Sequence, residues 1–333
     1  KSGADPAEID YNWGANAYQQ GDLPTALPKL RSAAEGDPGS DRTRLALERA
    51  EEQRSPELSV FAHGWSDNED RSYLQWGGEA NVFAVDRIRL GLFADQNRWE
   101  REGDGSEEGL RGGVQGLLYL DRAAWLDVRF WRIWMDEDLP DVDGRQLSLR
   151  LPNTLLSGHV ELIAAREELE TLEAIRADIR QTRYAARTYS RLLDVFDLYA
   201  NLSRLERTDE NDTTLVDGRL VYRAKEWPFL GLGYLFRFGD SDFDPPEYWA
   251  PRQLEQHQLY GNLRGAYGLV NFSLSGQAGY AKELDTDWRF VWGARAQADV
   301  RLNKHLSARA EAGYFEGPVY ERTTWTLGAA ARF

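Results

Sequence analysis

The hydrophobic pattern of the chain changes its period near residue 55, and this change limits the possible folds more than any other feature. Before Ser55 and Pro56, apolar residues recur every three or four positions; after them, apolar and polar residues alternate almost to the C-terminus. Alternation places successive side chains on opposite faces of a β-strand. The sequence therefore predicts a helical region over residues 1–55 and an all-β domain over residues 56–333.

The alternating stretches are long enough to cross a membrane. Runs such as 110–120 and 288–300 exceed the five or six residues usual in soluble sheets and suffice for a tilted strand in a bilayer. An even number of strands is expected for a single-chain bacterial barrel. We count sixteen strands, starting near residues 58, 73, 86, 108, 123, 146, 156, 171, 192, 213, 228, 253, 269, 286, 304 and 321.

The two faces of these strands differ in composition. One face carries Leu, Val, Ala, Gly and aromatic residues, whereas the other carries Arg, Asp, Glu, Gln and Asn. The second face is too charged for a dry core between two sheets, but it suits a water-filled interior. The sequence contains no run of about eighteen apolar residues, so we expect no membrane-spanning helix. The predicted fold is a transmembrane antiparallel β-barrel.

The connections between strands alternate between two classes. Short turns are predicted at 85–86, 121–122, 152–153, 225–228, 267–268 and 303–304. Longer, acidic loops are predicted at 66–70, 100–108, 135–144, 167–170, 208–213, 239–251 and 282–287. Bacterial barrels have short periplasmic turns and longer extracellular loops. We therefore expect the acidic loops at the extracellular rim, opposite the N-terminal helices.

Residues 166–190 are ambiguous. The main prediction is a strand over residues 171–181, followed by an irregular basic segment, RYAARTYSR, that forms a periplasmic turn or folds into the lumen. Leu169, Leu172, Ile175 and Ile179 also have helical spacing, which favours a helix as the alternative.

The first 55 residues resemble part of a helical repeat. Residues 5–38 have the 34-residue length of a tetratricopeptide (TPR) unit. The small, apolar and terminating positions of that unit are taken by Gly14, Ala26, Leu30, Ala33 and Pro38. The expected aromatic residue is displaced by one position, to Tyr18, and an unrelated helical hairpin is the alternative. We expect a short TPR-like α-helical segment before the barrel, from a processed or truncated chain whose repeat array is longer.

The predicted inward face supplies the candidate transport path. Its charged residues are Glu79, Arg89, Arg111, Asp127, Arg129, Glu161, Asp197, Arg219, Arg237, Arg295, Asp299 and Glu311. A hydrated track of this kind lets sugar hydroxyls exchange partners without tight binding. The alternative is that these charges pair across strands and only make the wall rigid.

One acidic loop combines carboxylates with aromatic rings. The candidate residues there are Asp240, Asp242, Asp244, Glu247, Tyr248 and Trp249. This mixture suits a cationic, partly deacetylated amino sugar through charge attraction and stacking. The alternative is a surface loop bridged to lipopolysaccharide by divalent cations. The loop lacks the EF-hand spacing, and we predict no resident metal site.

Several function classes are excluded by composition and motifs. The formal net charge of -15 argues against nucleic-acid binding, and the absence of Cys excludes thiol chemistry. The sequence has neither an HExxH nor a GxSxG motif. We therefore expect a protein that is not an enzyme and needs no cofactor.

The last strand and the overall plan resemble those of known exporters. The C-terminal segment WTLGAAARF ends in Phe333, like the insertion signal of bacterial outer-membrane barrels. Helical repeats joined to such a barrel, together with the loop segment YWAPRQL over residues 248–254, resemble the exopolysaccharide export porins for poly-N-acetylglucosamine, cellulose and Pel. The resemblance implies a pore that exports a polysaccharide chain and periplasmic helices that recruit a polymer-modifying enzyme.

The expected function is thus export of a secreted polysaccharide, such as a partly deacetylated amino-sugar polymer, through a charged lumen. The expected location is the bacterial outer membrane, with a monomeric barrel in contact with lipid and lipopolysaccharide and the helices in the periplasm. The alternatives are a translocon that assembles surface lipoproteins, which shares the plan of helices before a barrel, and a general diffusion porin, which does not need the helices.

Overall fold

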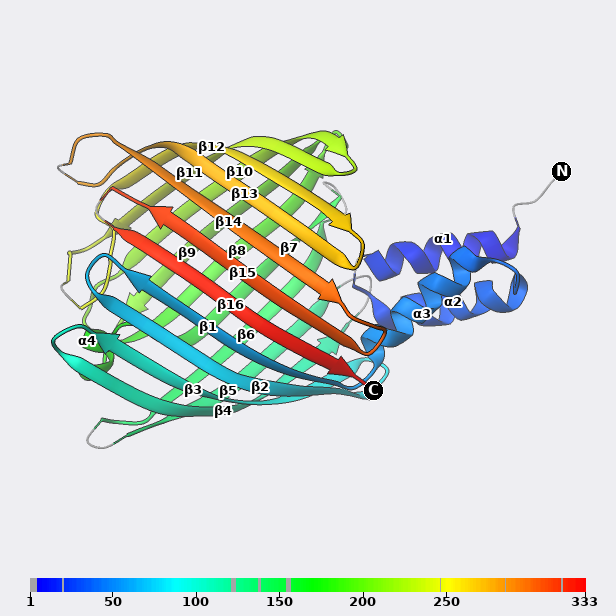
Figure 1. Ribbon diagram of the computed structural model, residues 1–333, viewed down its shortest axis with the longest axis horizontal. Coiled ribbons are helices and arrows are strands. Elements are labelled where there is room, and N and C mark those ends of the chain that lie inside the picture. Colours follow the sequence, from blue (N-terminus) through cyan, green and yellow to red (C-terminus); the bar gives the residue numbers. More distant parts are fainter. Residues whose placement is uncertain are drawn as a thin grey trace.

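Long alternating segments pair with their neighbours throughout the β domain. The computed structural model describes residues 5–19, 21–120, 124–136, 139–153, 157–245, 247–284, 286–318 and 320–333. Within them, three helices precede a closed barrel of sixteen strands (Figure 1). The predicted transmembrane-type barrel of about 16 antiparallel strands is confirmed as a fold. None of the described helices has the length and apolar content needed to cross a bilayer.

The strand boundaries lie close to the predicted ones, with one exception. The strands are β1 (Glu57–Asp67), β2 (Arg71–Val85), β3 (Ile88–Arg101), β4 (Gly105–Tyr119), β5 (Trp125–Met135), β6 (Val142–Asn153), β7 (Gly158–Glu168), β8 (Arg180–Leu192), β9 (Phe196–Arg207), β10 (Thr213–Glu226), β11 (Phe229–Ser241), β12 (Leu254–Tyr267), β13 (Val270–Lys282), β14 (Arg289–Arg301), β15 (Leu306–Glu316) and β16 (Glu321–Arg332).

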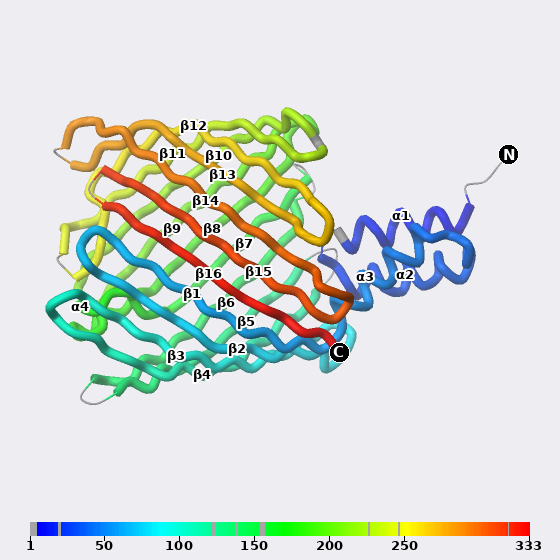
Figure 2. The backbone as a smooth tube through the Cα atoms, viewed as in Figure 1, coloured from blue at the N-terminus to red at the C-terminus, as the bar shows by residue number. Residues whose placement is uncertain are grey.

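Each strand is antiparallel to the next, and the C-terminal strand closes the cylinder. β16 pairs with β1 along its whole length, for example Val60 opposite Ala329 (Figure 2). Closure satisfies the backbone hydrogen bonds of the two strands that otherwise form open edges, which a bilayer requires. The outside of the barrel is apolar, with Leu92, Phe130 and Leu259 at 63%, 53% and 74% exposure.

The prediction for residues 171–181 is wrong. A short helix, α4 (Leu172–Arg176), occupies this segment, and the strand is the basic segment that follows it, β8. Leu172 and Ile175 lie almost one helical turn apart, so both can be buried on one side of the helix. In β8, Tyr184 faces outward at 47% exposure while Arg183 faces inward toward Glu167. Helix and strand coexist, so the count remains sixteen.

The N-terminal helices are α1 (Pro6–Gln19), α2 (Leu23–Gly36) and α3 (Asp41–Arg54). They lie at the rim that carries the short turns, and α4 lies at the opposite rim (Figure 1). α1 and α2 pack closely because Gly14 lacks a side chain: a Cβ there would lie 2.8 Å from Leu30 Cγ. The side chains of Asp22 and Ser40 cap the starts of α2 and α3 by accepting backbone hydrogen bonds.

Two ion pairs connect α3 to the turns of the adjacent rim. Arg54 pairs with Asp86 in the β2–β3 turn, and Glu52 accepts from Arg301 Nη2 at 2.6 Å at the end of β14. The ring of Phe83, near the end of β2, packs against the apolar cluster of the helices. The helices therefore contact the barrel at one rim.

Candidate transport path

Charged residues of neighbouring strands pair across the inner face of the barrel. Asp95 on β3 lies opposite Arg111 on β4, and their side chains are 3.0 Å apart (Asp95 Oδ1 to Arg111 Nε). Asp299 on β14 lies opposite Arg309 on β15 at 2.6 Å. Residues directly opposite in an antiparallel pair share one face, so the strand register itself places opposite charges together.

The sequence-predicted path residues lie on this inner face. Those that line cavities inside the barrel are Glu79, Arg89, Arg111, Asp127, Arg129, Arg219, Arg237, Arg295 and Asp299. The other three take cross-strand positions beside inward-facing arginines: Glu161 lies opposite Arg150 and Arg187, Asp197 Oδ2 is 3.2 Å from Arg223 Nε, and Glu311 Oε1 is 2.6 Å from Arg295 Nη2.

A loop folds into the barrel at the rim opposite the helices. We call residues 169–179, which include α4, the plug. Leu172 and Ile175 are 1% and 5% exposed and pack in one apolar cluster with Trp65, Trp99 and Ile133, which project inward from β1, β3 and β5. These aromatic and aliphatic wall residues give the plug an apolar seat in an otherwise polar lumen.

The plug reaches across the opening. It connects β7 to β8, which are half the circumference away from β16 in the strand order. Even so, Glu170 Oε2 accepts from Arg322 Nη2 of β16 at 2.9 Å and from Trp65 Nε1 at 2.9 Å. Thr171 Oγ1 donates to the Glu247 carbonyl of the β11–β12 loop at 2.7 Å. The plug therefore narrows this mouth of the barrel.

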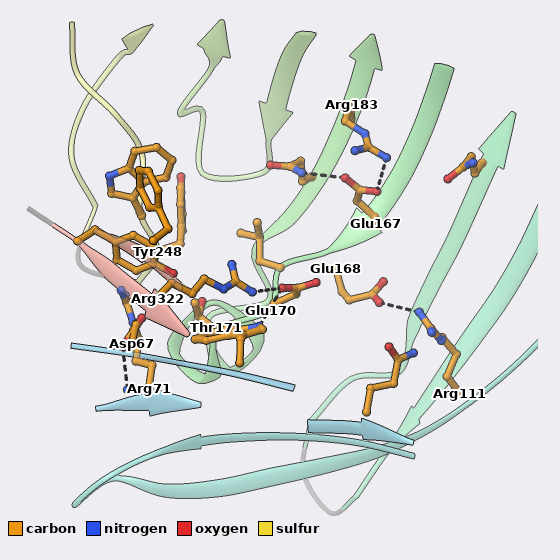
Figure 3. A pocket seen from close by; sticks show the side chains of 18 of the residues that line it. Asp67, Arg71, Arg111, Glu167, Glu168, Glu170, Thr171, Arg183, Tyr248 and Arg322 are labelled. Carbon is orange, nitrogen blue, oxygen red and sulfur yellow. Dashed lines mark hydrogen bonds and ion pairs between the residues drawn. The ribbon is translucent and has the colours of Figure 1, made fainter. Parts of the chain in front are cut away.

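A cavity of about 720 Å³ lies beside the plug, and we call it the rim cavity. Its lining includes six carboxylates and six guanidinium groups, together with the rings of Trp65, Trp131 and Trp249. Most of these charges are paired, as in Arg183 with Glu167 at 3.2 Å and Arg111 with Glu168 at 3.4 Å (Figure 3). The formal charges of this lining balance.

Hydrogen bonds hold the acidic loop of residues 239–251 against the rim. Asp240 and Asp242 accept hydrogen bonds from the backbone N–H groups of Gln253 and Asp212, each at 3.1 Å. Asp244 is exposed, and Glu247 is partly buried. Trp249 stacks on Tyr320 with 6.0 Å between the ring centroids.

Tyr248 differs from the exposed stacking residue that the sequence suggested. It is 4% exposed and lies beneath the Arg207 guanidinium at 4.5 Å from the ring centroid. Its hydroxyl donates to Asp209 Oδ2 at 2.6 Å and accepts from Asn211 Nδ2 at 3.0 Å. Burial, together with the hydrogen bond to Asp209, raises the pKa of Tyr248 well above its usual value, so the phenol stays protonated and keeps the loop in place.

Sequence reasoning missed Trp65, Glu168 and Glu170 as path residues. Glu168 accepts from Arg111 and from Trp131 Nε1, and Glu170 bridges the plug to the opposite wall. The helical spacing of the apolar residues from Leu169 to Ile179 indicated a helix there, but it did not show that this helix packs inside the barrel.

Comparison with solved structures places this geometry among outer-membrane proteins. A structure described as a bacterial polysaccharide outer membrane secretin superposes with a TM-score of 0.66 at 14% sequence identity, covering 84% of this chain and 99% of that one. The chain has a porin-like outer-membrane barrel fold. Weaker likenesses include Pseudomonas aeruginosa OccK2 in complex with glucuronate (TM-score 0.45, 11% identity, 84% and 98% coverage) and Pseudomonas putida OprB at low pH (0.39, 14%, 90% and 97%). No protein-family model and no curated protein matches the sequence.

Proposed function

We propose that this barrel is an outer-membrane pore for export of a secreted polysaccharide, with its helices in the periplasm. The observation that supports this most is the continuity of polar cavities along the lumen. The rim cavity shares Glu79 and Arg129 with a cavity deeper between β2 and β5, and it shares Tyr320 and Arg322 with another along β9 to β16. A path of this kind suits a flexible, hydroxyl-rich chain better than a compact solute.

The inner wall has the chemistry that a moving sugar chain requires. Guanidinium groups lie over inward-facing rings, as Arg111 does over Phe93 at 5.7 Å and Arg150 over Trp125 at 6.0 Å. Polar groups that are already paired within the wall offer many weak hydrogen bonds and few tight ones. Conduction needs such weak, repeated contacts, because a strongly held substrate cannot leave. The similarity in fold to a polysaccharide secretin is consistent with this role.

The helices support a periplasmic docking role. α1 and α2 form an antiparallel pair with a close contact at Gly14, where a TPR unit also has a small residue, and α3 extends the array toward the barrel. Exposed Trp13 and Ile9, at 56% and 49% exposure, lie on α1. We expect these TPR-like helices to bind a periplasmic polymer-modifying enzyme. They would thereby position the polysaccharide at the mouth of the pore beside them.

Deletion of the gene in its native host tests the proposal. We expect loss of secreted polysaccharide, with polymer retained in the periplasm, and restoration by the intact chain. Normal secretion with loss of surface lipoproteins would favour a lipoprotein translocon. Normal secretion with slower uptake of small solutes would favour a diffusion porin.

A further inference from the structure

A second cavity, of about 540 Å³, lies along the lumen wall from β9 to β16, and we call it the arginine cavity. Four arginines line it, and no Asp or Glu does so among the residues that the structure describes. The basic lining residues are Arg219, Arg264, Arg295 and Arg322. This composition differs from that of the rim cavity, where the charges balance.

Two of the four arginines are already neutralised. Arg295 pairs with Glu311 at 2.6 Å, and Arg322 pairs with Glu170 at 2.9 Å. The other two, Arg219 and Arg264, have no carboxylate partner within the described part of the chain. Their positive charges are therefore uncompensated inside the lumen.

Aromatic rings hold these two guanidinium groups in place. Arg219 lies between Tyr199 and Tyr260, with its Cζ 4.3 and 4.5 Å from the ring centroids. Arg264 lies over Phe229 at 4.2 Å. Stacking fixes the plane of a guanidinium and leaves its N–H edge free, so little freedom remains to be lost when a ligand binds.

The nearby carboxylates are engaged elsewhere. Asp217, two residues from Arg219 on the same strand face, accepts a hydrogen bond from Asn201 at 2.7 Å. Asp197 lies 3.2 Å from Arg223. Arg219 Nε is buried and has no hydrogen-bond partner among the described residues.

The rest of the lining is neutral and polar. Asn262, Ser273, Ser275, Gln277 and Gln297 supply hydroxyl and amide groups around the arginines. These groups match sugar hydroxyls, and a planar guanidinium matches a carboxylate through two parallel hydrogen bonds. A sugar ring bearing a carboxylate fits both features.

We propose that the arginine cavity is a binding subsite for the carboxylate of an acidic, uronate-type sugar in the exported chain, with Arg219 and Arg264 as its anion-binding residues. This rests on the proposed polysaccharide function and specifies its substrate class. It replaces the cationic polymer that the acidic loops alone suggested, because the uncompensated charge in this cavity is positive.

The test uses the purified full chain in planar lipid bilayers, with sugar hexamers added to block the single-channel current. The probes are the hexamer of galacturonate, sulfated maltohexaose, uncharged maltohexaose and fully deacetylated, cationic chito-hexaose. We expect the uronate to block at the lowest concentration. The double variant Arg219→Gln/Arg264→Gln should weaken that block by about tenfold or more, because two charge-assisted contacts are lost. It should also shift the reversal potential in a salt gradient toward cation selectivity.

Two further variants control for folding and for charge alone. Arg132→Gln/Arg204→Gln removes two arginines that face outward near the rim, and it should leave the block unchanged. Arg219→Lys/Arg264→Lys keeps the charge but loses the planar fork, and we expect it to keep the ion selectivity while still weakening the uronate block. Gel mobility without heating reports whether each barrel is folded.

The outcomes separate this inference from the broader function. The subsite assignment is overturned if uronate and neutral hexamers block the wild type equally, or if uronate blocks the Gln variant as strongly as it blocks the wild type. In either case a polysaccharide path stands. If a sulfated hexamer binds far more tightly than the uronate, the assignment to a carboxylate is overturned. If no hexamer of any charge affects the current, the export proposal itself fails as well.

Discussion

Shortening Leu172 to alanine is expected to release the plug and widen the far mouth of the pore. Leu172 is 1% exposed and packs in the apolar cluster with Trp65 and Trp99. Leu172→Ala removes three buried carbon atoms from this seat and leaves a gap that the rigid barrel wall cannot close. The barrel does not depend on this contact, because its sixteen strands pair independently of the plug.

The size of the effect follows from the kind of contact that is lost. Leu-to-Ala changes at buried sites cost about 2 to 5 kcal/mol, and we take about 2 to 3 kcal/mol because one side of the site borders a hydrated cavity. Each 1.4 kcal/mol is a factor of ten, so the ratio of released to docked plug should rise roughly 30- to 150-fold. Glu170→Gln should matter less, because the Glu170–Arg322 pair is partly exposed and contributes about 1 kcal/mol or less.

Single-channel recording in planar bilayers measures this directly. We expect Leu172→Ala to spend much more time than the wild type in a larger conductance level. Leu162→Ala is the matched control, because Leu162 lies on β7, the strand that leads into the plug, but faces outward at 46% exposure. If folded Leu172→Ala shows the same levels and dwell times as the wild type, the plug does not limit the pore and the argument is wrong.

Three other predictions test the wall, the helices and their contact. Gly279→Ala should destabilise the barrel by about 1 to 3 kcal/mol in urea titrations, because the new Cβ would lie 2.0 Å from a backbone oxygen. Gly276→Ala on the same strand should be tolerated, because its Cβ would lie 3.8 Å from the nearest atom. Hydrogen bonds from Lys29 and Ser32 lower the pKa of Asp10. This contact between α1 and α2 should therefore stabilise the helical hairpin above about pH 4, and the stabilisation should be lost as the pH falls through the lowered pKa. Amide exchange in the two helices should report this loss of stability, and Asp10→Asn should abolish the pH dependence of the hairpin's stability. Arg301→Gln should speed proteolysis between the helices and the barrel at low salt while leaving the barrel's urea midpoint unchanged, and equal cleavage rates would contradict the docking role of this pair.

The direction of the wall side chains could be predicted from the sequence because it depends only on the period of a β-strand. Asp299 and Glu311 face inward for the same reason that Leu274 and Leu327 face outward: residues two positions apart share one face. Once the turns were located, the phase of the strands followed, except for β8, which the sequence analysis had treated as an irregular segment. Loop length and acidity were sufficient to place the two rims.

The plug could not be predicted in this way. α4 has only five residues and lacks a side-chain cap at Thr171, so its own propensity is weak. The helix exists because Leu172 and Ile175 find an apolar seat on strands that are distant in the sequence. Local alternation in 171–181 favoured a strand, whereas burial of Leu172 and Ile175 favours a helix. The helix forms, because the tertiary contact outweighs the local pattern.

The pairing of individual charges was also beyond the sequence. Arg295 and Arg219 appear equivalent in an alternating strand, yet Arg295 pairs with Glu311 and Arg219 lies between two tyrosine rings. Which arginine is neutralised depends on cross-strand register and on side-chain packing across the wall. The net charge of the chain is a sum over the loops, the helices and the barrel wall together, so it does not give the sign of the charge in any one cavity.

The most direct test of a hydrated pore uses the absence of Cys from the chain. Gln277→Cys places a thiol in the arginine cavity, and Leu274→Cys places one on the same strand at an outward-facing position with 46% exposure. In barrels inserted in lipid, a charged, membrane-impermeant thiol reagent should modify Cys at position 277, reduce the single-channel current, and leave position 274 unmodified. Rapid modification at 274 with none at 277 would contradict a barrel whose interior is water and whose exterior is lipid.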